Sequence, residues 1–132
     1  RSALVRVPVP KKGKEDQGTR LEYRALDPAC NPYLAFSVLL AAGLAGIRHG
    51  YELPEETTVN LFESGADAPA DVGRRLPANL AEALDAMERS ELVREALGEH
   101  IFEWFLRNKR AEWGAYRTHV SSFELNRYLR TW

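Results

Sequence analysis

The sequence predicts an α+β fold that is mainly helical, with an antiparallel β-hairpin at its N-terminal end. Three observations lead to this prediction. Strand-like patterns fill residues 1–26, an apolar run follows an Asn-Pro pair, and apolar residues recur at helical spacing after position 76. A chain of 132 residues is long enough for one domain with one core.

The hairpin prediction comes from two short runs. Residues 3–9 are rich in β-branched side chains and are closed by Pro8 and Pro10, as suits an edge strand. Residues 11–19 are polar and contain two glycines, so they predict an exposed loop. Residues 20–25 alternate charged and apolar positions, which predicts a half-buried strand. We therefore expect a hairpin from about residue 4 to residue 25.

The alternation also predicts the two faces of the second strand. Leu21 and Tyr23 are expected to face a core, while Arg20, Glu22 and Arg24 share the opposite face at intervals of roughly 6.5–7 Å. A carboxylate between guanidinium groups can hold a divalent cation while the guanidinium groups bind an anionic substrate. The same residues also fit a solvated strand face whose charges neutralise one another. The pattern alone leaves both interpretations open.

A central helix is predicted next. Asn31 is a good N-cap and Pro32 suits the first helical position, so we expect a helix from there to about Arg48, ending near Gly50. The segment 31–49 is apolar on nearly all sides, which predicts a helix buried in a sizeable protein. This chain has little mass to bury it, so an exposed apolar patch or self-association is expected.

The apolar run itself covers residues 33–47 and contains Ser37. It is shorter than a membrane span, so we expect no membrane insertion. Residues 52–76 are rich in Pro, Gly, Asp and Glu without a sustained period, which predicts a long surface loop.

The remaining segment, residues 77–132, is predicted to be a helical tail. One helix ends near Arg89, a second covers about residues 91–116 with a break near Gly98, and a capping-box pattern opens a short helix that ends near Arg130. The expected inward face of the first helix consists of Leu76, Leu80, Leu84 and Met87. That of the second consists of Leu97, Ile101, Trp104, Phe105 and Asn108.

The net charge and the cysteine count argue against some classes of function. A net charge of −1 argues against a nucleic-acid surface or a membrane-surface module, both of which usually carry a basic excess. The single cysteine, Cys30, cannot form an internal disulfide, so a reducing, cytoplasmic compartment is expected. The chain begins on Arg1 rather than Met, directly ahead of a strand pattern, as expected of a cut through a larger protein.

Several segments form ordered motifs at compatible spacing. The first group is Arg1-Ser2-Ala3-Leu4-Val5-Arg6-Val7-Pro8, Arg20-Leu21-Glu22-Tyr23-Arg24 and Asp27-Pro28-Ala29-Cys30-Asn31-Pro32-Tyr33-Leu34-Ala35-Phe36. The second group is Leu39-Leu40-Ala41-Ala42-Gly43-Leu44-Ala45-Gly46-Ile47, Leu76-Pro77-x-x-Leu80-x-x-Ala83-Leu84 and Lys109-Arg110-x-Glu112-Trp113. Together they resemble the C-terminal part of the catalytic domain of type I glutamine synthetases, over essentially the whole chain.

The resemblance implies a glutamate–ammonia ligase that uses ATP and Mg²⁺ or Mn²⁺. ATP phosphorylates the side-chain carboxylate of L-glutamate, and ammonia then displaces phosphate from the γ-glutamyl phosphate to give glutamine. The resemblance also implies a homo-oligomer of two stacked rings, a dodecamer. The family's remaining metal ligands and its N-terminal domain would lie upstream of Arg1, so this chain alone is expected to be inactive.

The resemblance assigns roles to individual residues. Glu22 resembles a metal-ligand carboxylate, and Arg24 resembles the arginine that binds glutamate or its phosphorylated form. Arg1 resembles a catalytic arginine that reaches both phosphate and glutamate, and Arg6 one that contacts the phosphates of ATP. Arg20 is a weaker candidate for the nucleotide side of the site.

Two positions depart from the family pattern. Gln17 stands where a nucleotide-side lysine is common, and the loop around it is longer, so no role is assigned to it. Phe62 stands near the tyrosine that many bacterial members adenylylate. Because phenylalanine has no hydroxyl group to modify, we do not expect that form of regulation.

Two alternatives stay open. A related ligase that joins another amine or a polyamine to glutamate would keep the same residues, because its amine site is built mostly upstream. A non-catalytic helical interaction module could also inherit the scaffold. The joint presence of Arg6, Glu22 and Arg24 favours a ligase, because an inactive descendant would be free to lose any of them.

Overall fold

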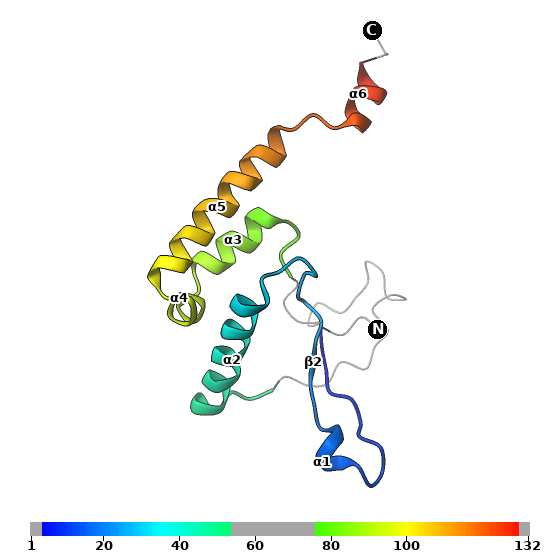
Figure 1. Cartoon of the computed structure of the whole chain (residues 1–132), viewed down its shortest axis with the longest axis vertical. Helices are drawn as coiled ribbons and strands as arrows, with labels where there is room; N and C mark the ends of the chain where they lie inside the picture. Colours follow the sequence, from blue (N-terminus) through cyan, green and yellow to red (C-terminus); the bar gives the residue numbers. More distant parts are fainter. Residues whose placement is uncertain (1–3, 54–75, 130–132) are drawn as a thin grey trace.

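The computed structural model describes residues 4–53 and 76–129, with Glu15 and Gln17 described by their backbone alone. Its elements are β1 (Val5–Arg6), α1 (Glu15–Gly18), β2 (Glu22–Tyr23), α2 (Pro32–His49), α3 (Leu80–Glu88), α4 (Glu91–Leu97), α5 (Glu99–Thr118) and α6 (Ser122–Tyr128) (Figure 1). A mainly helical chain with one antiparallel strand pair confirms the predicted fold class.

The hairpin is present but its strands are short. β1 and β2 pair antiparallel, with Val5 opposite Tyr23 and Arg6 opposite Glu22. The backbone N–H of Arg24 extends the ladder by donating to the Leu4 carbonyl at 2.9 Å. Pairing does not continue into the prolines that follow β1, because proline has no N–H to donate. The predicted loop also contains the single-turn helix α1.

The prediction that Leu21 and Tyr23 face a core is wrong for the described chain. The side chain of Leu21 is 67% exposed and that of Tyr23 is 38% exposed. The physical reason is that no described helix packs against either strand. Period-two alternation identifies residues that share a face, but it does not supply the element that covers that face.

Helix α2 begins and ends where its caps predict. The Asn31 side chain accepts hydrogen bonds from the backbone N–H groups of Tyr33 at 3.0 Å and Leu34 at 3.4 Å. Gly50 follows the helix with φ 61°, the left-handed conformation that glycine adopts most readily at a helix end. Local capping therefore fixes both ends of this helix.

None of the residues of α2 is buried within this chain. One half-buried face of the helix packs against α4 (Figure 1). The opposite side is an exposed apolar stripe, the α2 stripe, made of Tyr33, Phe36, Leu40, Leu44 and Ile47. The expected apolar patch is therefore present, and burial of α2 in a larger protein stays a prediction.

The expectation that the apolar run is too short for a membrane span needs correction. The helix has 18 residues, because Pro32, Arg48 and His49 are helical as well, and by length and composition alone it could cross a bilayer. The same length and composition also occur in core helices of soluble proteins. The helix therefore does not decide whether the protein meets a membrane.

The core of the described chain lies between α3, α4 and α5. Its buried residues are Leu84 from α3 and Phe102 and Leu106 from α5. Partly buried side chains complete it: Leu80, Met87, Val93, Leu97 and Phe105. Leu76, which was expected on this face, is exposed because α3 begins only after its N-cap Asn79.

The predicted inward face of α5 is only partly right. Ile101 and Trp104 are exposed, while Phe102, which was not predicted, is fully buried. The cause is Gly98, which ends α4 with φ 72° and ψ 153° and restarts the chain as α5. The residues of α5 that face the core therefore cannot be found by extending the helical periodicity of α4 past Gly98.

Helix α6 has the predicted capping box. The Ser121 hydroxyl accepts from the Glu124 backbone N–H at 3.2 Å, and the Glu124 carboxylate accepts from the Ser121 N–H at 2.7 Å. No described element packs against α6, which lies at the opposite end of the chain from the hairpin (Figure 1). The predicted loop over residues 52–76 lies almost wholly outside the described residues, as does Phe62.

We predict that Phe102→Ala destabilises the α3–α5 core by about 3–5 kcal/mol, the usual cost of removing a buried phenylalanine side chain. Phe123→Ala is the matched control, because Phe123 lies exposed on α6 and its loss should change stability by less than about 1 kcal/mol. Urea unfolding followed by circular dichroism measures both. Equal losses in the two variants would contradict the assignment of the core to this face.

Candidate functional site

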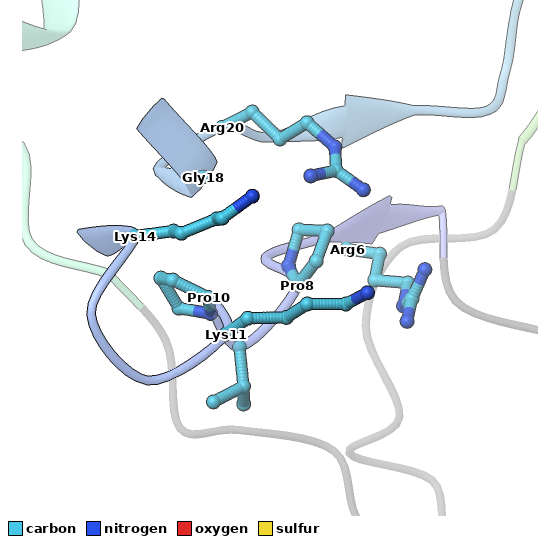
Figure 2. Close-up of a pocket in the computed structure, with 8 residues that line it drawn as sticks. Arg6, Pro8, Pro10, Lys11, Lys14, Gly18 and Arg20 are labelled. Atoms are coloured by element: carbon cyan, nitrogen blue, oxygen red, sulfur yellow. The ribbon is translucent and has the colours of Figure 1, made fainter. Parts of the chain in front are cut away.

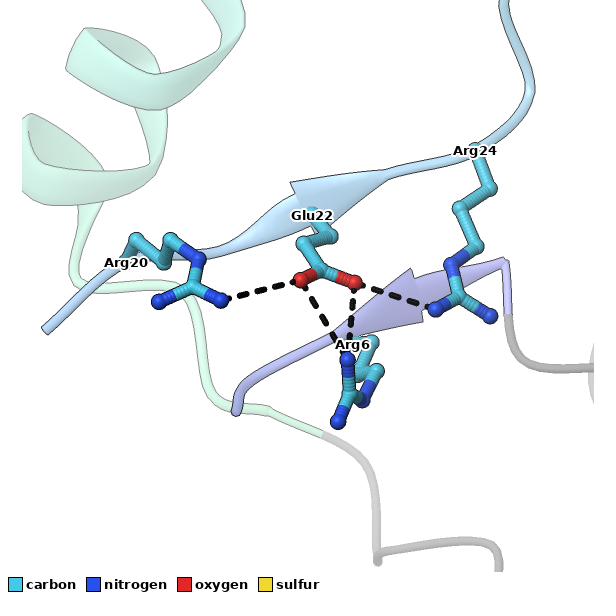
Figure 3. Close-up of polar contacts among 4 residues, drawn as sticks. All are labelled: Arg6, Arg20, Glu22 and Arg24. Atoms are coloured by element: carbon cyan, nitrogen blue, oxygen red, sulfur yellow. Dashed lines mark hydrogen bonds and ion pairs between the residues drawn. The ribbon is translucent and has the colours of Figure 1, made fainter. Parts of the chain in front are cut away.

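The β1–β2 pair places Arg6 directly across from Glu22. One guanidinium nitrogen of Arg6, Nη1, donates to both carboxylate oxygens of Glu22, at 3.3 Å and 3.1 Å (Figure 3). The register of the two strands thus allows Arg6 and Glu22 to form an ion pair. Arg6 therefore lies beside the charged face formed by residues 20–24.

Two more arginines reach the same carboxylate along β2. Arg24 Nη2 donates to Glu22 Oε2 at 3.0 Å, and Arg20 Nη2 approaches Oε1 at 3.4 Å (Figure 3). Residues two positions apart on a strand lie on one face, which is why both flanking arginines can meet Glu22. We call Arg6, Arg20, Glu22 and Arg24 the arginine–glutamate cluster.

The electrostatics of the cluster favour an ionised Glu22. The pKa of its carboxyl lies below the ordinary value of a glutamate, chiefly because of the hydrogen bond from Arg24 and then that from Arg6. The Glu22 side chain remains 29% exposed, so molecules from solvent can reach it. One negative charge faces three positive charges, and the remaining positive charge can bind an anion such as phosphate or carboxylate.

The described residues supply only some of the ligands that a divalent cation needs. No group of three or more His, Cys, Asp or Glu side chains that could hold a metal ion occurs in residues 4–53 and 76–129. Glu22 can supply a carboxylate oxygen of the kind that Mg²⁺ prefers. The described residues therefore fit one ligand of a metal site, and further ligands have to come from outside them.

Beside the cluster lies a hollow of about 360 Å³, which we call the loop-side hollow. Arg6 and Arg20 line it together with Lys11 and Lys14 from the segment between the strands (Figure 2). The two lysines were not predicted as site residues, because residues 11–19 were interpreted only as an exposed loop. Three lysines within four positions, next to Pro10, were the available signal.

The structure brings most of the predicted site residues together. Arg6, Glu22 and Arg24, with Arg20, form the cluster just described. Arg1 lies outside the described residues, so the role that the resemblance assigns to it stays a prediction.

Guanidinium groups gathered on a two-stranded hairpin around one carboxylate are typical of a protein that binds phosphate- or carboxylate-bearing molecules. The comparison with known families agrees and is more specific. Residues 1–128 match the family described as glutamine synthetase, catalytic domain, and the chain belongs to that family.

Curated relatives support the assignment. The chain is 52% identical over 130 residues to a glutamine synthetase of Mycolicibacterium smegmatis, and 53% identical over 130 residues to one of Mycobacterium tuberculosis H37Rv. It is 50% identical over 131 residues to one of Methanococcus maripaludis. Each match covers 98% of this chain, but the chain spans only 28–29% of the length of these relatives.

A solved structure also resembles this chain. It is described as apo GmaS without ligand, and it matches with a TM-score of 0.73 and 33% sequence identity. The match covers 86% of this chain and 26% of that chain. The fold of most of this chain therefore occurs in a protein with related sequence.

We predict that Glu22 titrates below the ordinary range and that Arg24→Gln raises its pKa more than Arg6→Gln does. A lowered pKa adds stability that is fully present above the ordinary glutamate value and is lost as the pH falls through the lowered pKa. Carbon-13 NMR of the side-chain carboxylate across pH 2–7 measures the shift.

Glu124 serves as an internal control for this titration. Its pKa is also lowered, but by the hydrogen bonds from the Ser121 backbone and hydroxyl, so neither arginine substitution should move it. If Glu22 titrates at the ordinary value in the unsubstituted protein, the cluster does not exist in solution.

Proposed function

We propose that this chain is part of the catalytic domain of an ATP-dependent ligase that joins ammonia to the side-chain carboxylate of L-glutamate. The observation that carries the proposal is the arginine–glutamate cluster, found in a chain that belongs to the glutamine synthetase family. The reaction needs positive groups around a transferring phosphate and around a carboxylate substrate, and three guanidinium groups on one strand pair supply them.

In this proposal Arg24 binds the glutamate carboxylate and then the phosphate of the γ-glutamyl phosphate. Its planar fork of N–H groups suits both, because each presents paired oxygens. Arg6 binds the phosphates of ATP, and it lies close enough to share Glu22 with Arg24. Arg1 is proposed as a third arginine that reaches both substrates.

Glu22 is proposed to supply one oxygen ligand to Mg²⁺ or Mn²⁺. Bound metal supplies charge neutralisation at the phosphate oxygens. Glu22 would hold such a cation through the oxygens that the arginines contact, and Arg6, Arg20 and Arg24 would bind the anionic substrates. Ion pairing with Glu22 keeps the arginines in place without blocking them permanently, since the pairs are exposed.

The assembly and location of the full-length protein are also proposals. We propose a cytoplasmic homo-oligomer of two stacked rings. The α2 stripe and the exposed apolar side chains of α6 are surfaces that further protein can cover. Those of α6 are Phe123, Leu125, Tyr128 and Leu129.

A ligase that uses another amine is the second candidate. The hairpin residues bind the glutamate and nucleotide side of the reaction in either case, so they do not distinguish the two. We place ammonia ahead of other amines because relatives named glutamine synthetase are 50–53% identical to this chain. Purified full-length protein assayed with ammonia, methylamine and a polyamine separates the candidates.

We predict that Glu22→Gln and Arg24→Ala fail differently in the full-length protein. Glu22→Gln removes the charge that holds a cation, so activity falls and partly recovers at high metal concentration. Arg24→Ala removes the fork that grips the reacting group. Its turnover number should therefore fall roughly a hundredfold, with weaker glutamate binding and no recovery by metal. Steady-state kinetics across a Mg²⁺ titration measures both.

Arg110→Ala is the control for removing one arginine charge. Arg110 pairs with Asp85 and Glu88 between α5 and α3, and it takes no part in the cluster. Its kinetics should stay near those of the unsubstituted protein. Near-normal rates in Glu22→Gln and Arg24→Ala would mean that the cluster is only a solvated charged face.

A further inference from the structure

A short segment of chain, residues 25–31, joins the arginine–glutamate cluster to the helices. No described helix packs against β1 or β2, so among the described residues this segment is the direct connection from the hairpin to α2 (Figure 1). Arg24 stands at the start of the segment, directly after β2. The position of the Arg24 side chain relative to α2 therefore depends on whether residues 25–31 form a defined turn or a flexible connection.

Asp27 makes this segment a defined turn. Its side-chain Oδ1 accepts a hydrogen bond from the Ala29 backbone N–H at 2.7 Å, and its carbonyl accepts one from the Cys30 N–H at 3.0 Å. Aspartate and asparagine side chains are short enough to close a turn by bonding to the backbone two positions further on. Asp27 thus contributes a side-chain bond and a main-chain bond to the same turn.

Two prolines stiffen the turn, and a helix cap continues it into α2. Pro28 fixes its own φ and restricts the backbone of Asp27 before it, and Pro32 is the first residue of the helix. Asn31 accepts hydrogen bonds from the first N–H groups of α2. The chain from Asp27 to the helix is therefore held by rings and hydrogen bonds, and only two residues separate Asp27 from Arg24.

On its other side Arg24 is held by the hairpin. Its N–H donates to the Leu4 carbonyl at 2.9 Å, and its Nη2 donates to Glu22 Oε2 at 3.0 Å. A strand pair this short restrains its own ends weakly, because two strands alone are marginally stable in water. The turn at Asp27 is thus the restraint on Arg24 from the side of the helices.

We propose that Asp27 is a positioning residue for Arg24: its turn sets the direction of β2 relative to α2 and so holds the Arg24 guanidinium at the cluster. None of the ion pairs between described residues involves Asp27, so its carboxylate serves here as a hydrogen-bond acceptor. That the positioned guanidinium binds glutamate and the reacting phosphate rests on the function proposed above, whereas the positioning itself does not.

Two substitutions at Asp27 separate the acceptor from the charge. Asp27→Asn keeps an oxygen that can accept from Ala29 and loses the charge, whereas Asp27→Glu keeps the charge and moves the oxygens one carbon further from the backbone. In the full-length protein Asp27→Asn should change the turnover number by less than about twofold, because the turn still closes. Asp27→Glu should lower it about tenfold and raise the KM for glutamate, with the KM for ATP nearly unchanged.

Asn79→Ala is the matched control. It also removes a side-chain acceptor from a backbone N–H, that of Glu82 at 3.0 Å, but at the start of α3 and outside the cluster. Steady-state kinetics of this variant should stay near those of the unsubstituted protein. Equal effects of Asn79→Ala and Asp27→Glu would overturn the positioning role, because any lost turn would then act alike.

A double-mutant cycle and a crystal structure test whether Asp27 acts through Arg24. Added to Arg24→Ala, Asp27→Glu should change the turnover number by less than about twofold, because no guanidinium is left to position. The crystal structure of full-length Asp27→Glu should show the contact between Arg24 Nη2 and Glu22 Oε2 lost and that between Arg6 and Glu22 kept. The full effect of Asp27→Glu in both backgrounds would contradict the proposal.

The crystal structure also separates the failure of this proposal from that of the proposed function. Displacement of Arg24 by Asp27→Glu in a protein without ligase activity overturns the proposed function and leaves the positioning role in place. An active ligase in which Asp27→Glu keeps the Arg24 contact overturns the positioning role. So does an equal loss of activity in Asp27→Asn and Asp27→Glu, because charge rather than the turn would then account for the effect.

Discussion

The carboxylate of Glu22 is the group on which the hairpin depends. Three guanidinium groups converge within hydrogen-bond distance of it, and without its negative charge they would repel one another. Arg6 lies on the other strand, so the same contact that neutralises charge also ties β1 to β2. Because one carboxylate cannot balance three arginines and the lysines beside them, the hairpin keeps an excess of positive charge that suits phosphate-bearing ligands.

The part of this site that follows from local pattern was predictable from the sequence. Period-two alternation places Arg20, Glu22 and Arg24 on one face, and a hairpin brings Arg6 across from them. The loop-side hollow was not predictable, because it depends on a contact between Pro10 and Gly18 that no periodicity signals. Nor does alternation say what covers the other face, which is why Leu21 was wrongly expected in a core.

The helices also have features that were predictable from the sequence and features that were not. The ends of α2 and α6 were predictable, since Asn31, Gly50 and the Ser121–Glu124 box act within a few residues. The inward face of α5 was not, because one glycine with a positive φ, Gly98, separates α5 from α4 and sets a new rotation of the helix about its axis. The hydrogen bonds that cap a helix can thus be deduced from residue types. The orientation of α5 relative to α4 depends instead on the backbone angles of Gly98, which the sequence pattern does not reveal.

Register is the last constraint, and it joins the fold to the proposed chemistry. A slip of one residue in β2 would move Glu22 to the opposite face and leave Arg6 across from an apolar side chain. Two paired residues in each strand give little backbone pairing to prevent such a slip. The ion pairs of Glu22, together with the packing of Gly18 on Pro10, favour the observed register over the slipped one. The side chains proposed to bind substrate therefore also select the backbone arrangement that presents them, so the geometry of the site and the structure of the hairpin depend on each other.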